Sequence, residues 1–288
     1  MTGAPGTHRI VEKVTDMKLE PFNRYGDEVT KLFWNPITFD RKTGNGCFII
    51  RFMPGGVSQP HEHLGFEEFY VVEGQMVDHD GVAYEAGSFV SLGPNVRHYS
   101  HAPEGVLLVA WLSGNNRALE VGEEMSFGPD TIKTGHFLPA TGKAPKGPIG
   151  THRVVEKVTD LELTPFDRYG EDVSKLHWNP ITFDRETGKG CFIIRFQPGG
   201  VSTPHEHFGM EEFYVVEGMV MDHDGQKYEA GDFVSLGPGV RHYSYSPDGA
   251  LMVAWLTDTN RTLAEGEELS FGPDVVQRAR YKAQAAAE

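Results

Sequence analysis

Residues 61–67 read HEHLGFE, and residues 205–211 read HEHFGME. Both stretches follow the pattern H-x-H-x3-E, and 37 residues after each first histidine stands a further histidine, His98 or His242. Residues i and i+2 of a β-strand point to the same side, so both histidines of each pair can face one interior. Three imidazoles and one carboxylate at a repeated spacing therefore predict two metal sites.

The predicted metal ligands form one set in each half of the sequence: His61, His63, Glu67 and His98, and then His205, His207, Glu211 and His242. Imidazole with one carboxylate accepts most first-row divalent ions and leaves coordination positions open for chemistry, unlike a closed structural site. The structural alternative is a set of hydrogen-bonded polar residues in a barrel that binds no metal. Two complete sets favour the metal.

The sequence is an internal duplication. Residues 7–9 (THR) recur as residues 151–153, and residues 127–130 (FGPD) recur as residues 271–274, a constant shift of 144 positions. Such a period is too long for a solenoid unit, so each copy is expected to be a whole domain. Between the copies proline and glycine crowd together, as in a linker. We therefore predict an N-terminal domain over residues 1–138, a linker over 139–150 and a C-terminal domain over 151–288.

Composition is that of a soluble globular protein. With 288 residues and 39% hydrophobic content, two domains can each bury a core. The net charge of -15 argues against nucleic acid or an anionic membrane as partner. The N-terminus resembles no signal peptide, and no apolar run reaches the length of a membrane span. Cys47 and Cys191 occupy equivalent positions and are poor disulfide partners, so we expect a cytoplasmic protein.

The local signals are those of strands and turns. Short β-prone segments lie at residues 47–52, 68–73, 77–79, 89–92, 97–100 and 106–112 of the first copy. Glycine and proline separate them, and the segment 68–73 is expected to end at Gly74. Many short strands at close spacing predict an all-β sandwich or barrel in each copy.

Two motifs resemble those of the cupin superfamily. Gly55-x5-His61-x-His63-x3-Glu67-x6-Gly74 is similar to the first cupin motif and recurs at residues 199–218. The second cupin motif, G-x5-P-x-G-x2-H, is similar to residues 87–98 and 231–242. The departures are Gly93 and Gly237 for its first proline and Asn95 for its glycine, and asparagine tolerates the left-handed conformation that Gly239 would adopt.

The chain is thus identified as a bicupin. The resemblance implies two tandem cupin jelly-roll barrels, each with one divalent transition metal held by the four residues of its set. The segment EEFYVVEG also resembles cupin-like domains of zinc-binding anti-sigma factors and of dioxygenases that cleave rings or diketones.

Six further residues are candidates for substrate binding. They are Arg51, Ser100, Trp111, Arg195, Ser244 and Trp255. An arginine near a strand end can bind a carboxylate with two hydrogen bonds, and a serine in phase with the ligand histidines can hydrogen-bond substrate. The structural alternatives are a solvated or ion-paired arginine and core tryptophans. The copies also differ near the ligands, as at Leu64 against Phe208, so pockets of different size are a further hypothesis.

Three function classes remain. The first is a mononuclear Fe(II) dioxygenase acting on a small keto or hydroxy substrate, aromatic ones included, that chelates the metal through oxygens, with dioxygen as co-substrate. The second is a lyase, isomerase or decarboxylase using Mn, Ni or Zn without redox change. Against its decarboxylase form, Ser58 and Ser202 stand where bicupin oxalate decarboxylases usually carry an arginine. The third is a non-catalytic metal-containing sensor or binding module. A monomer and a homodimer are both compatible with a bicupin.

Overall fold

The computed structural model describes residues 9–24, 29–126, 153–168 and 175–271. The expected linker over residues 139–150 lies outside this range. The described part of the chain consists of short β-strands and two 3-10 helices, so the all-β prediction is confirmed. In the same part of the chain, no helix is long and apolar enough to cross a bilayer.

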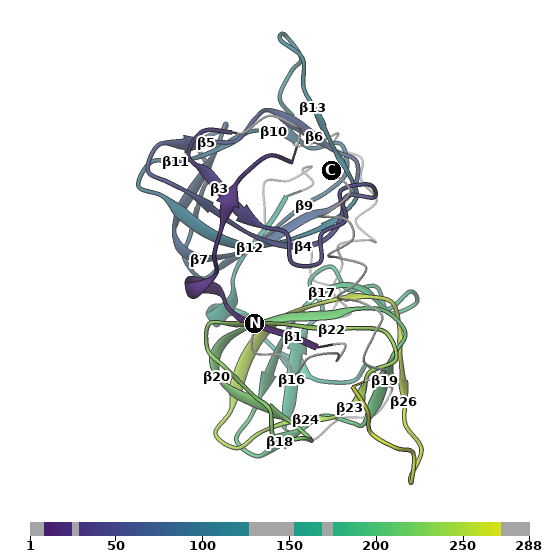
Figure 1. Ribbon diagram of the computed structural model, residues 1–288. Coiled ribbons are helices and arrows are strands. Elements are labelled where there is room, and N and C mark those ends of the chain that lie inside the picture. Colours follow the sequence, from purple (N-terminus) through teal and green to yellow (C-terminus); the bar gives the residue numbers. More distant parts are fainter. Residues whose placement is uncertain (1–8, 25–28, 127–152, 169–174, 272–288) are drawn as a thin grey trace. The chain divides into compact units, whose positions relative to one another are not determined.

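The described residues form two compact units, each a jelly-roll barrel (Figure 1). We call residues 17–126 together with 153–161 the N-terminal unit, and residues 9–16 together with 162–271 the C-terminal unit. The strands of the N-terminal unit are β2 (Glu20–Pro21), β3 (Leu32–Asn35), β4 (Asn45–Phe52), β5 (Gly56–Val57), β6 (His61–His63), β7 (Glu67–Asp78), β8 (Ala83–Glu85), β9 (Ser88–Leu92), β10 (Arg97–His98), β11 (Ser100–Ala102), β12 (Val106–Ser113), β13 (Asn116–Ala118) and β14 (Arg153–Lys157), which the 3-10 helix η3 (Val158–Asp160) follows.

The C-terminal unit repeats this arrangement. Its elements are β1 (Arg9–Lys13), η1 (Val14–Asp16), β15 (Thr164–Pro165), β16 (Leu176–Asn179), β17 (Lys189–Phe196), β18 (Gly200–Val201), β19 (His205–His207), β20 (Glu211–Asp222), β21 (Lys227–Glu229), β22 (Asp232–Leu236), β23 (Arg241–His242), β24 (Ser244–Ser246), β25 (Ala250–Thr257) and β26 (Asn260–Thr262).

Each unit is built from two sheets of the same design. In the N-terminal unit the larger sheet runs β14-β9-β7-β12-β4-β3-β2. In addition, β8 and β11 pair with β7, and β5 pairs with β11. The smaller sheet runs β10-β6-β13 and carries the histidine pair. The C-terminal unit has the orders β1-β22-β20-β25-β17-β16-β15 and β23-β19-β26. All the pairings are antiparallel.

The two units exchange their first strands. β1 opens the first copy of the sequence but pairs with β22 in the C-terminal unit, from Arg9 opposite Leu236 to Lys13 opposite Asp232. β14 opens the second copy and pairs with β9 in the N-terminal unit. The compact units therefore differ from the division at residues 138 and 151 that the repeat suggests. A duplication shows which segments are equivalent, but it does not show which copy's sheet an edge strand joins.

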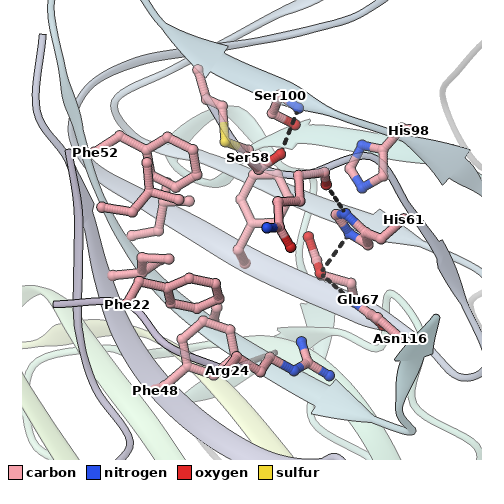
Figure 2. Close-up of a pocket in the computed structure, with 17 residues that line it drawn as sticks. Phe22, Arg24, Phe48, Phe52, Ser58, His61, Glu67, His98, Ser100 and Asn116 are labelled. Atoms are coloured by element: carbon pink, nitrogen blue, oxygen red, sulfur yellow. Dashed lines mark hydrogen bonds and ion pairs between the residues drawn. The ribbon is translucent and has the colours of Figure 1, made fainter. Parts of the chain in front are cut away.

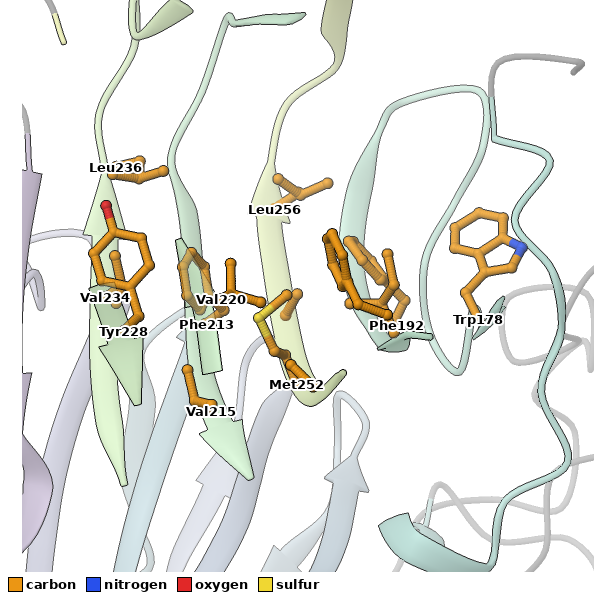
Figure 3. Close-up of a cluster of buried hydrophobic side chains, with 14 of the residues drawn as sticks. Trp178, Phe192, Phe213, Val215, Val220, Tyr228, Val234, Leu236, Met252 and Leu256 are labelled. Carbon is orange, nitrogen blue, oxygen red and sulfur yellow. The ribbon is translucent and has the colours of Figure 1, made fainter. Parts of the chain in front are cut away.

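Alternate residues of the central strands fill each interior. On β12, Val106, Leu108, Ala110 and Leu112 belong to the core of the N-terminal unit, while Trp111 between them points to the opposite side. Figure 3 shows the corresponding core of the C-terminal unit, where side chains from adjacent strands gather on one side of the sheet. This apolar interior surrounds the polar cluster described below and excludes water from much of it.

β7 does not end at Gly74, in contrast to the sequence-based expectation. It continues to Asp78 and changes register beside Leu107 and Leu108, where a β-bulge bends it. Gly74 has a φ of 76°, and a Cβ there would lie 2.1 Å from the carbonyl oxygen of Gly105. The glycine therefore permits a bend within one long strand, and that strand joins the metal-ligand region to Asp78.

Candidate metal centres

Three strands bring the four predicted ligands of each unit together. β6 holds His61 and His63 on one side, Glu67 is the first residue of β7, and His98 lies on β10 directly opposite His61. Because side chains alternate along β6, Glu62 lies between the two histidines and faces the other way, where it pairs with Arg117. The C-terminal unit places its four residues on β19, β20 and β23 in the same way.

The ligand atoms converge on one point in each unit. In both sets the candidate donor atoms all lie within 4.8 Å of one another. Nε2 of His63 lies 3.1 Å from Nε2 of His61 and 3.0 Å from Nε2 of His98. Oε2 of Glu67 lies 3.7 Å from His61 Nε2 and 3.6 Å from His63 Nε2. Two ligand atoms about 2.1 Å from one ion, at right angles to each other, lie about 3 Å apart, so the spacing fits a shared cation.

Hydrogen bonds to the far nitrogens orient two of the rings. Nδ1 of His61 lies 2.8 Å from the carbonyl oxygen of Gln59, which can only accept, so Nδ1 carries the proton. Nδ1 of His98 lies 3.0 Å from Oδ1 of Asp78, a buried carboxylate. In the neutral form of either ring, Nε2 then carries the lone pair and faces the cluster, the state that binds a metal ion.

Burial and charge favour the metal-binding forms of His63 and Glu67. Burial lowers the pKa of His63 well below its usual value, which keeps that imidazole neutral. Burial alone would raise the pKa of Glu67, but the neighbouring His63 and His61 outweigh it and hold that pKa far below its usual range. The Glu67 carboxylate is therefore ionised, the form that binds a metal ion. Glu211 and His207 show the same shifts in the C-terminal unit.

A pocket adjoins each cluster. Figure 2 shows His61, Glu67 and His98 at one side of the N-terminal pocket and the rings of Phe22, Phe48 and Phe52 at the other. The C-terminal pocket has the same mixture of cluster residues and apolar walls. An apolar cavity with a few convergent polar groups is the usual form of a small-molecule site.

Ser100 and Ser244, two of the six predicted substrate contacts, line these pockets. The hydroxyl of Ser100 donates to Oδ1 of Asp78, and that of Ser244 donates to Oδ1 of Asp222 over 2.6 Å. Both hydroxyl protons are therefore engaged with the carboxylate, and only the oxygen lone pairs of each serine remain to accept a hydrogen bond.

The other four predicted contacts lie away from the pockets. Arg51 alternates with Phe48, Ile50 and Phe52, which line the cavity, so its side chain emerges on the opposite side and pairs with Glu73 at 3.2 Å. Arg195 pairs with Glu217 in the same way. Trp111 and Trp255 are buried, out of phase with the lining residues of their strands. This placement does not support a substrate contact for any of the four.

An arginine that the motifs did not indicate lies in each pocket. Arg24 lines the N-terminal pocket and Arg168 the C-terminal one, and each guanidinium carbon lies 4.8 Å from the centre of a phenyl ring, Phe39 or Phe183. Burial and, to a smaller extent, the positive charge of Arg24 lower the pKa of His63. Figure 2 shows the guanidinium on the side of Glu67 and Asn116.

Asn116 lies between this arginine and the cluster, and its amide contacts one or the other according to its orientation. In one orientation of its amide, the nitrogen donates to Oε2 of Glu67 over 3.3 Å. In the turned orientation, the amide oxygen accepts from Nη1 of Arg24 at 3.3 Å. Arg24 precedes every motif residue by more than 30 positions, so no local sequence signal links it to the histidines.

The two pockets are more alike than the differences between the copies suggest. Leu64 and Phe208 are exposed, and neither lines a pocket. The lining differs instead at Gln59, which corresponds to Thr203, at Leu108, which corresponds to Met252, and at Met76, which corresponds to Val220. The pockets thus share their cluster, serine and arginine and differ in part of the wall.

Two jelly-roll barrels, each with a cluster of three histidines and one glutamate, define a bicupin with two candidate metal sites. The family model described as "ChrR Cupin-like domain" matches residues 8–114 and 152–258, so the chain belongs to this cupin family and carries two of its domains. Among curated proteins, none matches the sequence.

Solved structures share the fold at low sequence identity. A proposed dioxygenase from Nostoc punctiforme matches with a TM-score of 0.64 and 13% identity, over 94% of this chain and 88% of that one. A protein of Pseudomonas aeruginosa described as glyoxylate-induced matches with a TM-score of 0.50 and 16% identity, over 84% of each chain. A variant of Bacillus subtilis oxalate decarboxylase gives 0.49 and 13%, over 91% and 81%. These likenesses concern the fold alone.

Proposed function

We propose that the protein is a mononuclear Fe(II) dioxygenase acting on a small substrate that chelates the metal through oxygen atoms. The observation that carries the proposal is the position of each cluster of three histidines and one glutamate, which forms one side of an apolar cavity. The structural neighbour from Nostoc punctiforme, itself a proposed dioxygenase, is consistent with this assignment.

The chain's own residues would hold the metal and shape its surroundings. When bound, the ion supplies Lewis acidity and coordination positions open to substrate oxygens and to dioxygen. Gln59 and Asp78 fix the rings of His61 and His98, so the ligands need little rearrangement on binding. The phenylalanine walls exclude water and thereby strengthen electrostatic interactions in the pocket.

The pocket also limits the chemistry of the substrate. Phe22, Phe48 and Phe69 provide an apolar wall that suits an alkyl or aromatic body. Arg24 provides a cation beside the ligand cluster, and a guanidinium binds a carboxylate through two parallel hydrogen bonds. We therefore propose a small keto or hydroxy acid as substrate, with its oxygens toward the metal and its acid group toward Arg24 or Arg168.

A redox-neutral lyase, isomerase or decarboxylase is the second candidate. Its support is the same Arg24, because a cation beside the metal cluster can stabilise an enolate without dioxygen. Mn, Ni or Zn would suit the donor set equally well. A metal-containing sensor is the remaining alternative and requires no turnover at all.

We further propose that the protein works in the cytoplasm on a small molecule, with neither nucleic acid nor membrane as partner. The support is the net charge of -15. Light scattering of the purified protein measures its molar mass and so distinguishes a monomer from a homodimer.

Oxygen consumption separates the candidate functions. Protein loaded with Fe(II) is mixed in air with aromatic 2-oxo acids, 2-hydroxy acids and 1,3-diketones in an oxygen electrode, with H61A/H205A as the matched control. A dioxygenase consumes about one O2 per product, and the control variant consumes none. Product formed under argon by Mn-, Ni- or Zn-loaded protein would instead establish the redox-neutral reaction.

A further inference from the structure

We propose that Arg153 and Arg9 are positioning residues that act across the sequence repeats. Each orients a cluster histidine that belongs to the other copy of the sequence, through a buried aspartate. Arg153 of the second copy acts on His98, and Arg9 of the first copy acts on His242. The inference rests on metal binding by the clusters, which the proposed function shares, and does not depend on which reaction they catalyse.

The exchanged strand places Arg153 inside the N-terminal unit. β14 adds to β9 at the edge of the larger sheet, with Arg153 opposite Leu92. The side chain of Arg153 is only 1% exposed. A guanidinium so deeply buried requires partners that compensate for its lost hydration.

Its partners are the groups that surround Asp78. Nη1 of Arg153 lies 3.3 Å from the hydroxyl of Tyr84 and 3.7 Å from Oδ2 of Asp78. Nη2 lies 2.7 Å from Oδ2 of Asp80. The hydroxyl of Tyr84 donates in turn to Oδ2 of Asp78. Arg153 thus holds the outer oxygen of Asp78 both directly and through the tyrosine.

The inner oxygen of Asp78 reaches the metal cluster. Oδ1 accepts from Ser100 and from Nδ1 of His98, the latter over 3.0 Å. A carboxylate in this place fixes the tautomer and the rotation of the ring, and it makes Nε2 a stronger ligand. The chain of contacts therefore runs from Arg153 through Asp78 to the nitrogen that faces the cluster.

The same chain recurs with the copies interchanged. Nη1 of Arg9 lies 3.3 Å from the hydroxyl of Tyr228 and 3.7 Å from Oδ2 of Asp222. Its Nη2 lies 2.7 Å from Oδ2 of Asp224, and Oδ1 of Asp222 lies 3.0 Å from Nδ1 of His242.

Identical distances in both units argue against an incidental surface ion pair. The three-way contact needs the planar fork of arginine, since the ammonium of lysine is a single point of charge. It follows that each copy of the sequence supplies an arginine that supports the metal ligands of the other copy.

The test is carried out on the full chain with one site removed at a time. In an H205A/H207A background only the N-terminal cluster can bind, and Co(II) affinity is measured by competition with a chelator. R153M is expected to weaken that affinity by about 10- to 100-fold and to shift the Co(II) ligand-field bands. R9M in the same background is the matched control. We expect it to change the Co(II) affinity by less than about twofold and to leave the ligand-field bands unshifted. In an H61A/H63A background the two substitutions exchange roles.

Y84F removes the hydroxyl that bridges Arg153 and Asp78, and it leaves no buried charge without a partner. It tests the positioning role of Arg153 even if R153M does not fold. We expect Y84F in the H205A/H207A background to weaken Co(II) binding severalfold and to shift its spectrum. An unchanged spectrum with Y84F, or equal effects of R153M and R9M on the N-terminal site, would overturn the inference and leave the proposed function standing. A wild-type chain that binds no Co(II) at either site would overturn both.

Discussion

Nδ1 of His98 lies 3.0 Å from Oδ1 of Asp78, and both side chains are at most 1% exposed. The two residues are 20 positions apart and lie on different strands. Burial alone would raise the pKa of the Asp78 carboxyl, but His98, Ser100 and Tyr84 together hold that pKa below its usual range. A charged aspartate therefore stands behind a candidate metal ligand, in the arrangement that tunes imidazole ligands in metal sites.

Replacing Asp78 with asparagine tests this support. The amide keeps the size of the carboxylate but loses its charge, so the ring of His98 becomes a poorer ligand. We expect D78N to reduce the metal affinity of the N-terminal site by about 10- to 100-fold. Competition titration against a chelator measures it, with D222N as the reciprocal variant. Equal affinity in D78N and wild type would show that the contact does not serve the metal.

Replacing Arg24 tests the proposed contact with an acidic substrate. A hydrogen bond to a charged group contributes about 1.5–3 kcal/mol, so R24M in a chain whose C-terminal site is disabled is expected to raise KM by about 10- to 100-fold. R51M is the matched control, because Arg51 pairs with Glu73 away from the pocket and should leave KM unchanged. Steady-state kinetics with an acid substrate and its methyl ester gives the answer. An equal change with both substrates would contradict the carboxylate contact.

Gly74 and Gly81 provide a matched test of the bulge in β7. Both have positive φ, 76° and 86°, but a Cβ on Gly74 would lie 2.1 Å from a carbonyl oxygen, whereas a Cβ on Gly81 would have no neighbour within 4 Å. G81A is expected to cost about 1 kcal/mol from the backbone alone. G74A should cost at least about 3 kcal/mol, since the strand must move. Chemical denaturation measures both. Similar losses of unfolding free energy in G74A and G81A would show that β7 can shift to accommodate a Cβ at position 74.

Metal addition should stabilise the fold. An ion that binds only the native state at 100 times its Kd adds about 2.7 kcal/mol. We expect Tm to rise on adding Fe(II) anaerobically, or Zn(II) in air, to metal-free protein, and to fall again with a chelator. H61A/H205A should show little of this shift. A shift of equal size in that variant would indicate binding elsewhere.

The barrel and the clusters were predictable because their signals are local. In H-x-H-x3-E the two histidines share one side of β6 and the glutamate begins the next strand, so seven consecutive residues specify most of the cluster. The left-handed conformation expected at Asn95 is confirmed by its φ of 68°. Each of these depends on residues close in sequence.

The remaining features depend on contacts between distant segments. Asp78, Arg24 and Arg153 reach the clusters only after sheet pairing, and β14 supplies its arginine across the boundary of the repeat. Alternation along β4 and β12 could have excluded Arg51 and Trp111 from the pocket, because their neighbours Ile50 and Ala110 are inward-facing. The continuation of β7 through Gly74 was missed because glycine marks both the end of a strand and a bend within one.

The central claim is that each barrel binds one metal ion through three histidines and a glutamate. Elemental analysis of protein purified without a histidine tag tests it most directly, with H61A, H205A and the double variant measured in parallel. The account predicts about two ions of one transition metal per wild-type chain, about one in each single variant and none in the double variant. A wild-type chain free of transition metal that takes up none on incubation, or a double variant that retains its metal, would contradict it.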